Sequence, residues 1–94
     1  MVKSTSNKCW IQEYVGTETD IVIPEKICGK TVVGIDNGAF AYCDSLISVI
    51  IPNSVTSIGD SAFSHCTNLK RVEIPNSVTK IEGDAFSSCR SLIV

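Results

Sequence analysis

Hydrophobic positions recur every 23 residues through most of the chain. Residues 51–71 and 74–94 are identical at 12 of 21 positions. A fixed period of about 20 to 50 residues predicts a solenoid, in which each coil buries its apolar face against its neighbours. The five columns with this spacing are Ile35, Ile58 and Ile81; Ala39, Ala62 and Ala85; Phe40, Phe63 and Phe86; Cys43, Cys66 and Cys89; and Leu46, Leu69 and Leu92.

Each coil contains a strand, a turn and a compact segment. In residues 71–74 charged and apolar side chains alternate, which predicts a short strand with its apolar set inward. Pro75 ends this strand because it has no N–H for a ladder. Residues 84–89 start with Asp84, a suitable N-cap residue, and predict a short helical turn. The repeat therefore predicts parallel strands at about residues 20–23, 47–51 and 70–74.

The N-terminal third departs from the repeat. Residues 1–7 are polar and are expected to be flexible, and residues 9–15 predict a strand followed by a turn. We expect residues 8–34 to form a hairpin cap and an irregular first coil, with five extra residues after Pro24. The cap would cover one end of the stack. The covering side chains would be Trp10, Ile11 and Tyr14.

These patterns predict one domain, residues 1–94, in which residues 35–94 form the regular repeats. The fold class is a β-rich, α+β solenoid. Its features are a right-handed coil, parallel strands on one face, short helical turns opposite, an N-terminal β-hairpin cap and a spine of stacked phenylalanines.

The last coil has no comparable cover. It would expose apolar side chains and an unpaired strand, which favours association. Two explanations stay open: the chain belongs to a longer array, or two copies pack end to end as an isologous dimer. The residues expected at this self-association end are Ile81, Phe86, Cys89, Leu92 and Val94.

Composition narrows the function classes. Apolar residues make up 44% and charged residues 19%, as in a folded globular protein. The 8 basic residues are scattered, so we expect no nucleic-acid partner. No apolar run approaches about 18 residues, so we expect no membrane span. The start of the chain lacks a signal-peptide core, which leaves a cytoplasmic protein or a removed leader open.

The candidate chemical groups favour structural roles. Cys43, Cys66 and Cys89 would form an inward column, which packs as small apolar side chains and does not supply four converging zinc ligands. His65 has Tyr42 and Ser88 as its repeat equivalents, so we expect it to face solvent. We therefore predict no enzyme activity, no metal and no cofactor.

Two cysteines lie outside the repeat, Cys9 and Cys28. A disulfide between them would close a loop of about 20 residues and contribute roughly 3 kcal/mol. Two free thiols are the alternative, because spacing alone does not determine disulfide geometry.

The pattern I-P-N-S-V-T-x-I-x-x-x-A-F-x-x-C-x-x-L-x-x-V-x-I-P resembles the BspA-like, or Treponema-type, leucine-rich repeats over residues 19–94. The first coil departs from it through its insertion. The resemblance implies a short leucine-rich-repeat solenoid of the kind found in large surface or secreted proteins of host-associated bacteria and some parasitic protists. It also implies adhesion to host proteins or to other cells through a sheet that lines a concave face. It identifies no binding residues.

The outward strand positions are the candidate protein-binding face: Asp20, Val22, Ser48, Ile50, Arg71 and Glu73. Val22 and Ile50 would form an apolar patch flanked by charges, as at an interface hot spot, or would simply belong to a solvated sheet face. The first hypothesis is that the chain is a protein-binding module of a surface or secreted adhesin. Its partner would be a host or matrix protein. The second is a structural spacer or self-associating unit with no separate ligand.

Overall fold

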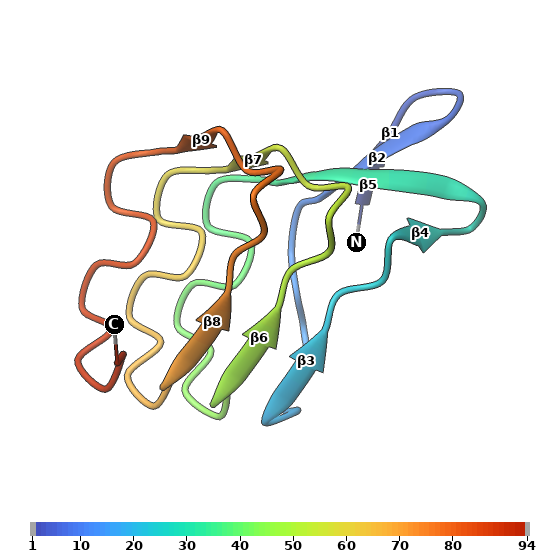
Figure 1. The fold of residues 1–94 in the computed structure, drawn as a ribbon. Coiled ribbons are helices and arrows are strands. Elements are labelled where there is room, and N and C mark those ends of the chain that lie inside the picture. The colour runs from blue at the N-terminus through green and yellow to red at the C-terminus, as the bar shows by residue number, and fades with distance from the viewer. Residues whose placement is uncertain (1, 94) are drawn as a thin grey trace.

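A computed structural model describes residues 2–93, which wind into a β-solenoid of about three turns (Figure 1). Two sheets run along the stack of coils. The strands are β1 (Val2–Ser4), β2 (Lys8–Ile11), β3 (Asp20–Val22), β4 (Lys26–Ile27), β5 (Lys30–Ile35), β6 (Ser48–Ile50), β7 (Ser57–Ile58), β8 (Arg71–Glu73) and β9 (Lys80–Ile81).

The first sheet has the order β3-β6-β8, one strand from each coil, and all its pairs are parallel. Its register aligns equivalent repeat positions, so that Ile21, Val49 and Val72 lie side by side. The three parallel strands predicted from the alternating pattern are thereby confirmed.

The second sheet follows the order β1-β2-β5-β7-β9, with β4 paired to β5. The short parallel strands β7 and β9 lie outside the three strands predicted from the repeat. The prediction of strands on one face and helical turns on the other is therefore wrong. Residues 2–93 contain two sheets and no helix.

The predicted helical turns are replaced by stacked turns. The N–H of Phe40 donates to the carbonyl of Ala62 in the next coil at 2.7 Å, whereas a helix would direct it back along its own chain. Ala62 instead closes a local turn to Gly59 at 3.2 Å. Each segment then ends in a left-handed residue, with φ of 61° at Tyr42 and 59° at His65. Alternating bonds within and between coils exclude a helical ladder.

The N-terminal hairpin cap predicted over residues 8–34 is not confirmed. β2 pairs in parallel with β5, and its antiparallel partner is β1, which lies in the segment expected to be flexible. The insertion of five residues is accommodated by the β4–β5 hairpin. Its turn places Cys28 and Gly29 at φ of 51° and 77°, as two-residue hairpin turns require.

The three residues expected to cover this end of the stack contact it, although the elements differ. Ile11 is buried. Trp10 lies against Gly34, where an added Cβ would come within 2.5 Å of the indole Cδ1. Tyr14 stacks on Phe40 with ring centroids 5.2 Å apart. Because Gly34 has no side chain, the indole can lie close to β5.

The core is built around the predicted phenylalanine spine. Phe40 stacks on Phe63 at 5.0 Å and Phe63 on Phe86 at 5.3 Å, with nearly parallel rings. Tyr14 extends the spine by one ring at the N-terminal end. Aromatic pairs at such centroid distances add about 0.5–1.5 kcal/mol per pair beyond area burial.

Candidate functional site

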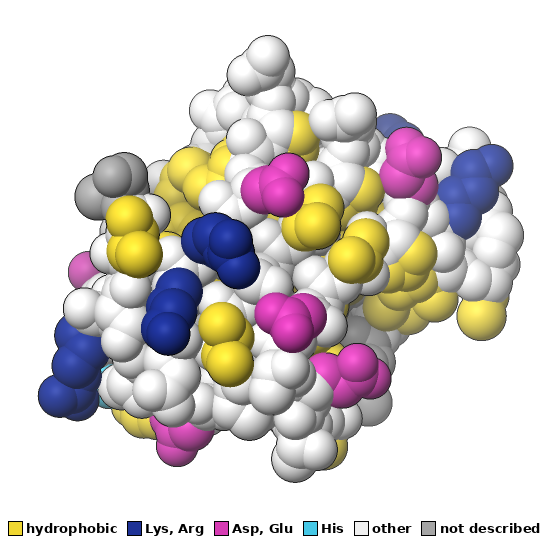
Figure 2. Space-filling model, turned by 60° about the horizontal axis from the view of Figure 1, so that its bottom comes forward, with side chains coloured by type: hydrophobic (Ala, Val, Ile, Leu, Met, Phe, Trp, Pro, Cys, Tyr) yellow, Lys and Arg dark blue, Asp and Glu magenta, His cyan; other side chains and the backbone are white. Residues whose placement is uncertain are grey.

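The six outward residues of the first sheet lie in two rows across the strands. The first row is Asp20, Ser48 and Arg71, and the second is Val22, Ile50 and Glu73. The structure thus places all six predicted positions next to one another. Val22 is 69% exposed and Ile50 is 39% exposed. The sheet lies toward the viewer in Figure 2, which shows hydrophobic, basic and acidic side chains interspersed.

The first row is polar and partly ordered by hydrogen bonds. The hydroxyl of Ser48 donates to Oδ1 of Asp20 at 2.6 Å, and the hydroxyl of Thr19 donates to Oδ2 at 3.2 Å. The Ser48 bond is the largest cause of the lowered pKa of Asp20, and Thr19 and the positive charge of Arg71 add to it. Asp20 is therefore negatively charged at neutral pH.

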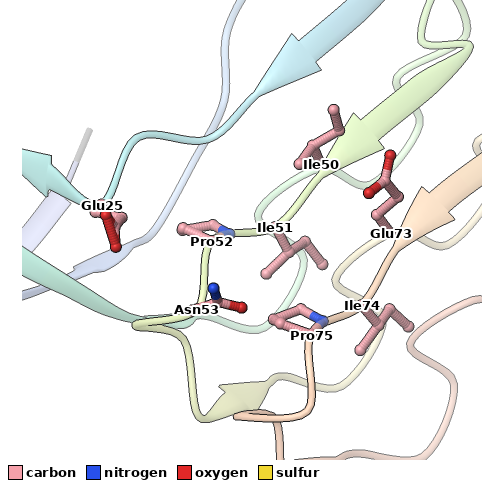
Figure 3. A pocket seen from close by; sticks show the side chains of 8 residues that line it. All are labelled: Glu25, Ile50, Ile51, Pro52, Asn53, Glu73, Ile74 and Pro75. Carbon is pink, nitrogen blue, oxygen red and sulfur yellow. The ribbon is translucent and has the colours of Figure 1, made fainter.

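Two shallow hollows lie along the second row. The first, of about 270 Å³, is lined by Ser48, Val49, Ile50, Arg71 and Glu73. The second, which we term the corner hollow, has a volume of about 380 Å³ and lies where the chain leaves the sheet (Figure 3). Its lining residues are Glu25, Ile50, Ile51, Pro52, Asn53, Glu73, Ile74 and Pro75.

Most corner-hollow residues were missed in the sequence. The prolines were interpreted only as strand terminators, and Glu25 belongs to the irregular first coil. A signal was present, because Ile-Pro recurs at the end of each strand of this sheet. The Ile-Pro pair occupies residues 23–24, 51–52 and 74–75. Its recurrence indicates that the prolines of successive coils lie at one edge of the stack.

The last coil exposes an apolar end. A hollow of about 320 Å³ there is lined by Val72, Ile74, Ile81, Phe86, Leu92 and Ile93. It brings together three residues of the predicted self-association end. The fourth, Cys89, is half-buried and does not line the hollow, and Val94 lies outside the described residues.

Two thiols of the cysteine column donate hydrogen bonds to backbone carbonyls of the preceding coil. The thiol of Cys66 donates to the carbonyl of Phe40 at 3.0 Å, and that of Cys89 to the carbonyl of Phe63 at 2.9 Å. Burial raises the pKa of Cys66 to about 12, and burial also raises the pKa of Cys43 and Cys89. These thiols are therefore protonated and poor nucleophiles at neutral pH.

The remaining chemical groups do not converge. Cys9 is buried and Cys28 is exposed, and both are free thiols. His65 is exposed and stacks on Tyr42 with ring centroids 4.5 Å apart. Within residues 2–93, no group of three or more His, Cys, Asp or Glu side chains is placed to hold a metal ion. The same residues include no helix with the length and apolarity to cross a membrane.

The fold closely matches solved leucine-rich-repeat proteins. A T. pallidum leucine-rich repeat protein superposes with a TM-score of 0.94 at 37% identity, covering 98% of this chain and 44% of that one. A leucine rich cell surface protein from Faecalibacterium prausnitzii A2-165 gives 0.84 at 34% identity, covering 98% and 29%. A leucine-rich repeat protein from Bacteroides ovatus gives 0.84 at 27% identity, covering 98% and 26%.

The chain thus spans less than half the length of these solved relatives. The search of curated proteins gave no significant match. The family described as the BspA type leucine rich repeat region matches residues 19–93. On this match, and on the repeat geometry that agrees with it, the chain is a leucine-rich-repeat module that belongs to the BspA-type family.

Proposed function

We propose that this chain is a protein-interaction module of a cell-surface protein, and that it binds through the outward face of the β3–β6–β8 sheet. The observation that supports the proposal most directly is the neighbouring pair Val22 and Ile50, which are exposed on adjacent strands beside charged side chains of the same face. Interfaces commonly place an apolar centre inside a polar rim. The regular backbone beneath keeps the pair in place without an ordering cost on binding.

Surface location is supported by the F. prausnitzii relative, which is described as a leucine rich cell surface protein. The partner would then be an extracellular protein, and adhesion to a host or matrix protein is the corresponding role. Three strands present a small face, so this module alone would bind weakly, since stable interfaces bury roughly 1,200 Å² or more.

The proposed surface location is tested by labelling. Membrane-impermeant biotin should label the protein on intact cells of its source, and a lack of labelling would contradict surface display.

The binding role is tested with the double variant Val22→Lys plus Ile50→Lys. Both side chains are exposed, so the fold should persist while two charges replace the apolar pair. Binding of the chain to a panel of purified extracellular-matrix proteins would be measured by biolayer interferometry. We expect more than about tenfold weaker binding to any matrix protein that the unmodified chain retains.

A matched control adds the same two charges elsewhere. Val15→Lys plus Thr17→Lys changes exposed residues in the loop before β3 and should leave binding unchanged. Circular dichroism would confirm that both variants remain folded. Equal binding by the unmodified chain and both variants would exclude this sheet face as the binding surface.

The second candidate function, self-association, is favoured by the apolar hollow of the last coil. Ile81, which belongs to the edge strand β9, and Ile93 are exposed there. Two copies could cover each other's ends with two-fold symmetry, an isologous contact. Sedimentation velocity over a range of concentrations tests this. A dimer that dissociates on Ile81→Lys supports it, and a monomer at the highest concentration contradicts it.

A further inference from the structure

We propose that the corner hollow binds an aliphatic side chain of the protein partner together with an adjacent lysine or arginine. This inference rests on the proposed binding role of the sheet face, because the hollow shares Ile50 and Glu73 with that face. It names the chemistry of the partner segment, which the face alone does not.

The apolar part of the hollow is preformed. Ile51, which is only 3% exposed, forms its base, and Pro52 and Pro75 project from successive coils beside it. Figure 3 shows Pro52 and Ile51 between Glu25 and Glu73, with Pro75 and Ile74 below them. Proline has a fixed φ and little freedom to lose, so an aliphatic side chain can bind there at little ordering cost.

The ionisable side chains that line the hollow are all acidic. Glu25 and Glu73 are its only ionisable lining residues, and both are exposed. Neither carboxylate has a hydrogen-bond or ion-pair partner within residues 2–93. The nearest basic residues in sequence are Lys26 and Arg71, and neither lines the hollow. The two carboxylates therefore remain available to a cation from outside.

The two parts together distinguish between partner segments. A basic residue beside the bound aliphatic side chain would lie near Glu25 or Glu73, whereas an acidic residue would be repelled by both. Selectivity of this kind arises from the repulsion as much as from the attraction. Arg71 borders the neighbouring hollow, so the preference for cations should be limited to the corner.

Three blocked pentapeptides of equal length test the proposal: Gly-Lys-Leu-Lys-Gly, Gly-Glu-Leu-Glu-Gly and Gly-Lys-Ser-Lys-Gly. Each would be titrated into the ¹⁵N-labelled full chain while amide shifts are recorded. We expect saturable shifts of the amides at residues 50, 51, 53, 73 and 74 with the first peptide only. Glu25→Gln and Glu73→Gln should each weaken its binding about 2- to 5-fold, as for exposed ion pairs. Glu18→Gln is the matched control and should have no effect.

Two results would overturn the proposal. One is equal binding of the lysine–leucine and glutamate–leucine peptides. The other is the lack of saturable corner shifts at about 10 mM, where even a complex with a Kd of ~1 mM would be nearly full. Either result leaves the wider sheet face open, because Val22 does not line the hollow and the single variant Val22→Lys tests the face separately. Loss of matrix binding in that variant, with no corner shifts here, would place the partner elsewhere on the face.

Discussion

The second coil, residues 46–68, and the last coil, residues 69–91, have closely similar sequences in different surroundings. Ile58 is fully buried, whereas its equivalent Ile81 is 49% exposed. Ile51 is 3% exposed and its equivalent Ile74 is 41% exposed. The second coil has neighbours on both sides, and the last has one. Burial in this molecule therefore follows from the number of neighbouring coils, and not from the repeat sequence alone.

The aromatic spine shows the same difference at its two ends. Phe40 has Tyr14 on one side and Phe63 on the other, and it is buried. Within residues 2–93, Phe86 stacks only on Phe63, and it is half-buried. One tyrosine from outside the repeat thus does for the first coil what a further coil would do for the last.

The largest expected effect comes from truncating the spine in each coil. Phe63→Ala should lower the free energy of unfolding by about 3–5 kcal/mol, because the side chain is fully buried between two rings. Phe86→Ala should cost about half as much, since one of its faces is already open. Urea denaturation followed by circular dichroism measures both.

A loss of 3–5 kcal/mol is a large part of the stability of a domain this small, and Phe63→Ala could fail to fold. Phe63→Leu retains more of the buried volume and should cost less, which keeps the comparison measurable. Similar losses for the alanine variants at both positions would show that the last coil is as well covered as the second.

A smaller effect is expected from pH, through the buried thiols. Burial raises the pKa of Cys66 to about 12 from an ordinary value of 9.0. The folded state therefore holds this proton more tightly than the unfolded state. Its contribution to stability is complete below about pH 9 and is lost as the pH rises toward 12. We expect a loss of about 1–2 kcal/mol between about pH 8 and pH 10.5.

Variants isolate that contribution from other groups that titrate in this range. Cys66→Ala should remove most of this loss. Cys89→Ala should remove less, because its thiol, also raised in pKa by burial, lies in the half-covered last coil. Cys28 is exposed, and Cys28→Ala should leave the pH dependence unchanged. Urea titrations at both pH values with a reducing agent measure the differences, and identical pH dependence in all four proteins would contradict the prediction.

Much of this fold could be predicted from the 23-residue period. Column identity predicted the phenylalanine spine, and alternation predicted the strands of the first sheet and their outward residues. The second sheet could not be predicted in the same way. Its strands, such as β7 at Ser57–Ile58, are two residues long in the regular coils, too short to show an alternation.

The errors had local physical causes. Asp84 and the following small residues suit a helix start, but left-handed backbone at Ser88 and bonds to the adjacent coil prevent one. A sequence pattern does not show a positive φ at a non-glycine residue. The corner hollow was missed because Glu25 and Glu73 come from coils that are not adjacent, so only the stack brings them together.

The smallest expected effect is the sharpest test of the comparison between the second coil and the last. Ile58→Val removes one methylene from a fully buried site and should cost about 0.5–1.5 kcal/mol. Ile81→Val makes the same change where half the side chain is in water, and should cost less than about 0.5 kcal/mol. Both would be measured by urea denaturation at low and high protein concentration. Equal losses would show that the last coil is covered in solution, and a cost at Ile81 that grows with concentration would identify a second copy as the cover.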